Sequence, residues 1–121
     1  MTAARVPYFL FALLAGCASP LSTATGTVND ARAVLDVAHD MITDTCVPAY
    51  DHAASAEQLA EADEKCKPAR EAYDVARAAW TEAAFAVLAA KSGAPVDLTV
   101  TGAKLSAAVA ALAHPMKAVR K

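Results

Sequence analysis

The chain has 121 residues, of which 56% are hydrophobic and 20% charged, and its formal net charge at pH 7 is −2. This length suits one small domain, and the net negative charge gives no support for nucleic-acid binding. Nucleophile elbows, phosphate-binding loops and haem-attachment motifs are absent, so the sequence predicts no catalytic residue and no enzyme activity.

The first sixteen residues have the three parts of a secretory signal. Arg5 and the amino terminus supply positive charge, and an apolar run follows at 6–15. This run is too short for a transmembrane helix, which needs about 20 apolar residues. It leads into the tetrapeptide Leu14-Ala15-Gly16-Cys17. This tetrapeptide resembles the lipobox of bacterial lipoproteins.

The resemblance implies that residues 1–16 are a signal peptide and that the mature chain begins at Cys17, which carries a covalent lipid. Two or more acyl chains, such as palmitate, would anchor the protein stably in a membrane. In lipoproteins of Gram-negative bacteria, Ala18 rather than Asp after the cysteine points to the outer membrane. The expected location is therefore the cell envelope. The alternative is an ordinary secretory signal in which Cys17 is incidental.

Residues 17–28 are predicted to form a flexible tether, because 18–27 is rich in Ser, Thr, Pro and Gly and carries no charge. A helical domain is expected over 29–113. Its first helix begins near Asn29 or Asp30, which are good N-cap residues, and runs to about Cys46, where Pro48 stops or kinks it. The apolar stripe of this helix comprises Ala31, Val34, Leu35, Ala38, Met41, Ile42 and Thr45.

The segment 55–91 is also predicted to be helical. Ser55-Ala56-Glu57-Gln58 has the form of a capping box, and it directs Leu59, Ala62 and Cys66 toward the core. Pro68 either starts a new helix or kinks a continuous one, which leaves one helix or two. Apolar residues at helical spacing follow: Tyr73, Ala76, Trp80, Ala83, Ala84, Val87 and Leu88. Residues 92–95, Ser-Gly-Ala-Pro, end the helix.

The last segment carries a mixed pattern. Val96, Leu98 and Val100 alternate with polar residues as a strand would, but a lone strand has no partner here. We therefore expect a helix from its cap at Asp97 to Ala113. The residues facing inward would be Leu98, Leu105, Val109 and Leu112. His114-Pro115 ends this helix, and 114–121 is expected to be a basic tail.

The remaining cysteines, Cys46 and Cys66, form an even pair in an exported chain, which indicates a disulfide. Neither a Cys-x-x-Cys spacing nor a ligand set supports a zinc or redox pair. Alanine-rich helices bury little area, and this bridge would stabilise them by about 3 kcal/mol. The predicted fold is all-α, a small helical hairpin or a three- to four-helix bundle stapled by one disulfide.

Charge is distributed unevenly along the chain. Residues 29–64 hold nine acids against Arg32 alone, whereas residues from Lys65 onward hold nine bases against four acids. We favour an acidic helix lying beside a basic one, with charge pairing that fixes their register. The alternative is a bipolar surface that engages a charged envelope partner.

Few side chains suggest a site. Asp36, His39 and Asp40 share one side of the first helix and could hold a metal with His52, but charged residues on a solvent face need no ligand. We therefore predict no metal and no cofactor beyond the lipid. Tyr73 and Trp80 are interpreted as core residues. For Phe85 the sequence leaves open an exposed anchor for a partner or packing against the last helix.

The preferred function is a small, non-enzymatic, membrane-anchored envelope lipoprotein. It would bind another envelope component, a protein or part of the cell wall, through a helical surface. One alternative is a phage-type lysis or surface-exclusion lipoprotein that acts on the membrane. Another is a structural spacer.

Overall fold

The computed structural model describes residues 20–120. Within this range the chain forms three long helices and no strand. They are α2 (Pro20–Asp51), α3 (Ala56–Lys91) and α4 (Leu98–Arg120). The predicted all-α class is confirmed, as a three-helix bundle stapled by one disulfide. The predicted signal peptide, its cleavage motif and Cys17 lie outside the described residues.

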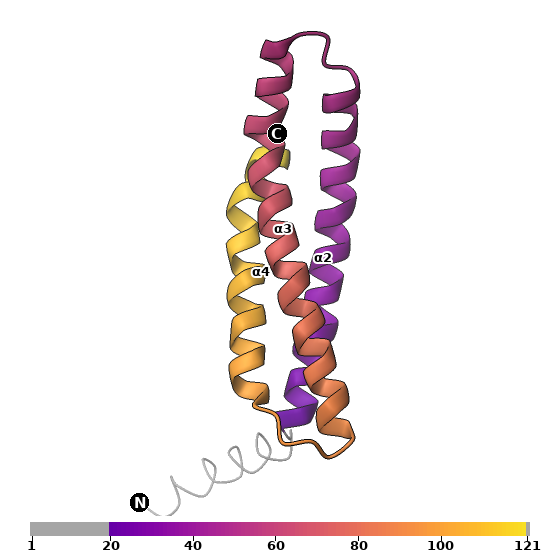
Figure 1. The fold of residues 1–121 in the computed structure, drawn as a ribbon, viewed down its shortest axis with the longest axis vertical. Helices are drawn as coiled ribbons and strands as arrows, with labels where there is room; N and C mark the ends of the chain where they lie inside the picture. The colour runs from indigo at the N-terminus through magenta and orange to yellow at the C-terminus, as the bar shows by residue number, and fades with distance from the viewer. Residues whose placement is uncertain (1–19, 121) are drawn as a thin grey trace, which may run out of the picture.

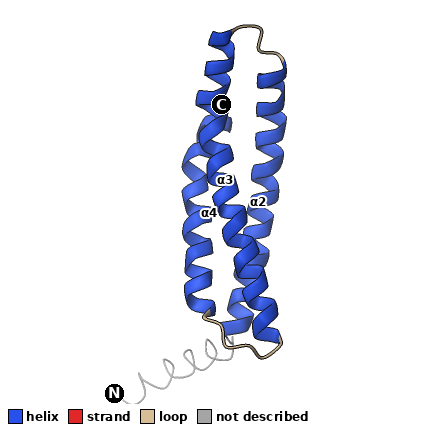
Figure 2. Cartoon of the chain, viewed as in Figure 1, coloured by secondary structure: helices blue, strands red, loops and turns tan. Residues whose placement is uncertain are grey.

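The helices run back and forth along one axis. α2 and α3 form an antiparallel hairpin, and α4 runs back along both of them (Figure 1). Two short connections, 52–55 and 92–97, join the helices (Figure 2). The start of α2, the end of α3 and the start of α4 therefore lie at the same end of the bundle. α4 ends before the hairpin turn, so α2 and α3 continue beyond it (Figure 1).

The core is built largely from alanines, whose small side chains let helices approach closely. The buried residues are Ala24, Ala31, Leu35, Ala38, Ile42 and Cys46 on α2, Ala62, Cys66, Ala69, Ala76, Ala79, Ala83 and Val87 on α3, and Leu105, Leu112, Met116 and Val119 on α4. The three largest fully buried side chains, Leu105, Leu112 and Val119, all belong to α4. α4 therefore supplies much of the apolar bulk that covers the alanines of the hairpin.

The predicted inward stripes are only partly correct. On α2, Ala31, Leu35, Ala38 and Ile42 are buried, but Val34 is 46% exposed. On α3, Leu59 and Leu88 are exposed as well. A three-helix bundle buries a narrower arc of each helix than these wide stripes would fill, because no fourth helix covers the remaining apolar positions.

α2 begins earlier than the sequence predicted. The expected tether over 17–28 is helical in its described part, from Pro20 onward. Pro20 is tolerated there because the first turn of a helix leaves its N–H groups unpaired in any case. Ala24 is buried, and the indole N–H of Trp80 donates to the Val28 carbonyl oxygen at 2.9 Å. These tertiary contacts outweigh the low helix propensity of a Ser/Thr-rich segment.

Prolines do not end the helices where the sequence predicted. Pro48, Pro68 and Pro115 lie inside α2, α3 and α4, respectively. The predicted helix ends at Cys46 and Ala113 are therefore wrong, and residues from Ala56 to Lys91 form a single helix. A proline in a helix costs about 3 kcal/mol.

Packing of the residues next to each proline explains why the helices continue. Cys46 and Cys66, each two residues before a proline, are buried and bonded to each other. Met116 and Val119 follow Pro115 and pack into the same cluster. The residues expected to form a basic tail from 114 are therefore the last two turns of α4, as far as Arg120.

Predicted helix caps are confirmed at three ends. The Ser55 hydroxyl oxygen accepts from the Gln58 backbone N–H at 3.2 Å, and the Gln58 side-chain oxygen accepts from the Ala54 N–H at 2.6 Å. The Asp97 carboxylate accepts from the Val100 N–H at 3.0 Å. α3 ends at Lys91, where Gly93 adopts a φ of 89°, a left-handed conformation that suits glycine.

Candidate functional site

An apolar groove of about 380 Å³ runs between α2 and α4. It is lined by Ala33, Val34, Val37, Ala38 and Met41 from α2 and by Val109, Leu112, Ala113, Met116 and Arg120 from α4. We call this feature the α2–α4 groove. Nine of its ten lining residues are Ala, Val, Leu or Met, so its walls offer packing surface and almost no polar group for chemistry.

The α2–α4 groove exists because α2 carries two adjacent apolar rows. One row, which includes Leu35 and Ala38, faces the core, and the second row is Val34, Val37 and Met41. Positions three and four apart lie on the same side of a helix. Val37 is 58% exposed. Met41 is half-buried and packs against the core cluster, so the second row forms a ridge that the described helices cover at Met41 and leave exposed at Val34 and Val37.

Charge surrounds this ridge asymmetrically. The exposed residues of α2 include Asp30, Asp36, Asp40 and Asp44, with Arg32 as the single base. Asp30 lies four residues before Val34 and Asp44 three residues after Met41, so helical spacing places both acids at the ends of the ridge. The α2 side of the groove is consequently acidic, whereas Arg120 lines its α4 side.

A disulfide clamp lies beyond the groove, at the level where α4 ends. Cys46 and Cys66 are buried, and their Cα atoms are 5.9 Å apart. Val119 of α4 belongs to the same buried cluster. The predicted pairing of Cys46 with Cys66 is therefore present in the structure. It joins α2 to α3 at the last point where the third helix supports them.

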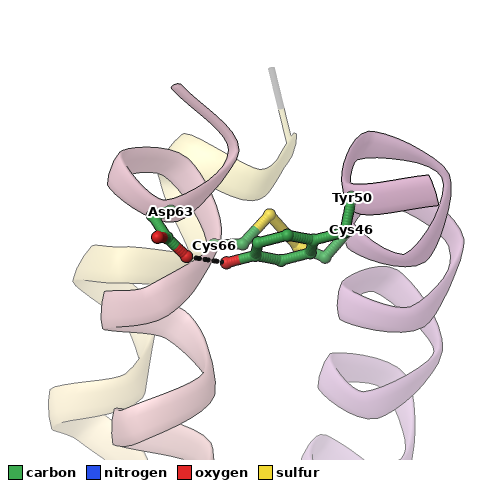
Figure 3. Close-up of a disulfide and its surroundings, with 4 residues drawn as sticks. All are labelled: Cys46, Tyr50, Asp63 and Cys66. Atoms are coloured by element: carbon green, nitrogen blue, oxygen red, sulfur yellow. Dashed lines mark hydrogen bonds between the residues drawn. A yellow bond between two sulfur atoms is a disulfide. The ribbon is translucent and has the colours of Figure 1, made fainter. Parts of the chain in front are cut away.

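Tyr50 reinforces this clamp. Its ring extends from α2 beside the disulfide, and its hydroxyl donates a hydrogen bond to the Asp63 carboxylate on α3 (Figure 3). The Arg70 guanidinium lies 5.3 Å from the centroid of the Tyr50 ring. The hydrogen bond to Asp63, together with burial and the charge of that carboxylate, raises the pKa of the Tyr50 hydroxyl, and Arg70 opposes this shift.

The hairpin arm, defined here as residues 47–65, extends past the clamp. Its segment 47–64 contains five acidic residues and neither Lys nor Arg. The acids are Asp51, Glu57, Glu61, Asp63 and Glu64, and all five are exposed. The arm is therefore a strongly acidic projection whose two helical halves are joined by the Tyr50–Asp63 hydrogen bond and by the disulfide at its base.

The predicted charge pairing between an acidic and a basic helix is not found. Within residues 20–120, the ion pairs join His39 to Asp40 inside α2 and Lys104 of α4 to Glu82 of α3. Neither links α2 to α3. The register of that hairpin is set by the Cys46–Cys66 bond, by apolar packing and by the hydrogen bonds of Tyr50 and Trp80 between the two helices, which sequence charge counts cannot reveal.

The four residues considered as metal ligands do not come together as a site in the structure. Asp36, His39 and Asp40 lie on α2, and His52 lies in the hairpin turn. The His39 ring packs 5.8 Å from the ring of Tyr73, centroid to centroid. In the described part of the chain, no group of three or more His, Cys, Asp or Glu side chains is placed to hold a metal ion.

The aromatic residues separate into core and surface. Trp80 and Tyr73 are half-buried and pack against the core, as predicted. Phe85 is 65% exposed, so it does not pack against α4. Sequence reasoning missed the α2–α4 groove because it assigned Val34, which is exposed, to the core, and because it treated Met41, which packs against the core, as covered on every side. The width of the α2 stripe was the available signal, since it exceeds what two neighbouring helices can cover.

Comparison of the chain with protein-family models, with curated proteins and with solved structures gives no significant match. Across residues 20–120, no helix combines the length and the apolar character needed to cross a membrane.

Proposed function

We propose that this protein is a small, non-enzymatic lipoprotein of the bacterial cell envelope that binds a helix of another envelope protein in the α2–α4 groove. The observation that carries the binding proposal is the apolar ridge of Val34, Val37 and Met41 beside α4, in which Val34 and Val37 are exposed. A fourth helix laid along this ridge would complete a four-helix bundle. Recognition would rest on apolar packing and charge.

Lipid anchoring at Cys17 is the second part of the proposal. It is supported by the resemblance of Leu14-Ala15-Gly16-Cys17 to a lipobox. It also agrees with the bonded pair Cys46 and Cys66, because stable disulfides belong to compartments outside the cytoplasm. If the host is Gram-negative, Ala18 favours the outer membrane.

The charges around the groove define the partner. The α2 side is acidic, with Asp30 and Asp44 at the ends of the apolar ridge. A helix that fits would carry apolar residues at every third or fourth position. Lys or Arg would flank this stripe on the side that meets α2. We therefore propose a basic amphipathic helix of a second envelope protein as the occupant.

In-cell crosslinking of the C-terminally tagged full chain tests this proposal with a matched pair of variants. Val37→Glu places a charge in the groove, whereas Val75→Glu places one on α3 at a valine that is similarly exposed, 63% against 58%. The expected result is one crosslinked partner that is retained in Val75→Glu and lost in Val37→Glu. Circular dichroism of both variants checks that the helices persist.

Other outcomes contradict parts of the proposal. Equal recovery of the partner with Val37→Glu would exclude the α2–α4 groove as its site. A crosslinked product with twice the mass of the chain would show that a second copy occupies the groove. Cell lysis on overexpression that depends on Cys17, with no specific partner, would favour action on the membrane instead.

A further inference from the structure

One end of the bundle is almost uncharged. We call the segments 20–29 and 83–103 the basal end, because they bring together the first turns of α2, the last turns of α3 and the first turns of α4 (Figure 1). Residues from all three helices meet there, among them Ala24, Val87 and Leu98. The two segments contain only two charged residues, Lys91 and Asp97.

The basal end also exposes large apolar side chains. Leu88 lies within one turn of the end of α3, and Val96 and Val100 lie in the connection to α4 and in its first turn. Phe85 lies about one turn before Leu88 on α3, and its side chain is the most exposed of the four. These apolar residues are exposed where few charges accompany them, whereas the hairpin arm at the other end carries five acids beside its exposed Val47 and Leu59. This difference makes the basal end the candidate interaction surface.

The short segment between Cys17 and α2 determines what the basal end faces if Cys17 carries a lipid. Only two residues lie between Cys17 and Pro20, the first residue of α2, so the two positions are three residue steps apart. Three residues span at most about 11 Å, whatever their conformation. The lipidated cysteine would therefore hold the start of α2, and with it the basal end, within about 11 Å of the bilayer surface.

We propose that the basal end rests in the headgroup layer of the lipid bilayer, with Leu88 and Val96 in contact with lipid. This inference rests on the proposed lipid anchor and adds an orientation to it. Apolar side chains of surface-bound helices enter the headgroup and acyl boundary by about 5–10 Å. Lys91 can extend its ammonium group to lipid phosphates while its aliphatic stem stays against the apolar surface.

This orientation separates the two ends of the molecule by charge. α3 has 36 residues, so its length of about 54 Å carries the acidic hairpin arm far from the membrane. If the arm approached the membrane instead, anionic lipids would repel it. They would tolerate the nearly uncharged basal end. The bundle would then stand on the membrane and present the α2–α4 groove along its side.

Quenching by brominated lipid tests the contact directly. The full chain is expressed, processed in cells, purified from membranes and reconstituted in phosphatidylcholine vesicles whose acyl chains are brominated near the headgroup. A tryptophan is placed by Leu88→Trp at the basal end or by Val47→Trp on the hairpin arm, each with the native Trp80 retained, because Trp80 holds the first turns of α2 in place. Both native residues are exposed aliphatic side chains on helices.

The expected result is a loss of fluorescence for Leu88→Trp relative to unbrominated vesicles, with no loss for Val47→Trp. The fluorescence of Trp80, measured in the parent in both kinds of vesicle, is subtracted from that of each variant. Equal fluorescence of Leu88→Trp in both vesicles, on protein that floats with them, would overturn the basal contact and leave the anchor standing. Failure of the parent to float with vesicles would overturn the anchor and the basal contact together.

Discussion

The indole N–H of Trp80 donates a hydrogen bond to the backbone carbonyl oxygen of Val28 across 52 residues of chain. This bond joins the middle of α3 to the early part of α2, in the segment whose composition resembles a tether. Ala31 and Leu105 are buried in the cluster that packs against the same indole. Trp80 therefore explains why α2 is helical well before Asn29.

Trp80→Phe should loosen the first two turns of α2. We expect a loss of about 1–2 kcal/mol in the free energy of unfolding from the hydrogen bond and the smaller ring. Amide hydrogens of residues 24–28 should exchange faster with solvent. The control is Phe85→Leu, which changes an exposed aromatic residue. Unchanged exchange in this segment would contradict the explanation.

The bond between Cys46 and Cys66 should account for a large share of stability. Its residues are 20 apart in sequence, and closing a loop of this size stabilises a domain by about 3 kcal/mol. Denaturation of a Cys46→Ser, Cys66→Ser double variant should show a loss of that order. Reducing agent should destabilise the parent alone. Equal stability of the parent with and without reductant would contradict this prediction.

The end of α4 should be essential rather than dispensable. Deleting residues 114–121 removes the buried side chains of Met116 and Val119, each of which contributes about 1.5–3 kcal/mol. Thermal unfolding should show a strongly destabilised domain. Deleting only Arg120 and Lys121 should leave stability nearly unchanged. A stable domain after the longer deletion would restore the interpretation of this segment as a tail.

Tyr50 should titrate above its ordinary range because of Asp63. The hydrogen bond to that carboxylate, burial and its charge raise the pKa of the Tyr50 hydroxyl above 10.0 in the folded protein. A raised folded-state pKa contributes stability that is present below the unfolded pKa and is lost as pH rises through the folded pKa. The contribution of Tyr50 should therefore disappear above pH 10.

Asp63→Asn tests this linkage by ultraviolet titration of tyrosinate. The pKa of the Tyr50 hydroxyl should fall toward its usual value, since the amide carries no charge. Glu61→Gln is the matched control, because it neutralises another exposed acid of the hairpin arm that does not contribute to the Tyr50 shift. Identical titration curves for Asp63→Asn and the parent would contradict the assignment.

Local signals predicted the all-α class, the caps at Ser55 and Asp97, and the pairing of Cys46 with Cys66. The class and the caps depend on chemistry within a few residues, and the pairing follows because only two cysteines remain after Cys17. The path of each helix through its proline could not be predicted locally. The cost of Pro48 and Pro115 within their helices is offset by packing between helices, such as that of Val119 on α4 beside the disulfide of α2 and α3.

The candidate site was predicted even less completely. The α2 sequence shows a wide apolar stripe, and the sequence alone assigned Val34 and Met41 to the core. Which part of a wide stripe is covered depends on the number and angles of the neighbouring helices. That arrangement depends on the whole chain. The same reason explains why Phe85 could not be assigned to the surface in advance.

The lipid on Cys17 is the central claim, because both the location and the basal contact depend on it. Intact-mass spectrometry of the protein purified from membranes, with Cys17→Ser as the control, tests it most directly. The account predicts a mature chain that begins at Cys17 and carries the added mass of a diacylglyceryl group, which the control lacks. An unmodified Cys17, or a chain cleaved elsewhere, would contradict it.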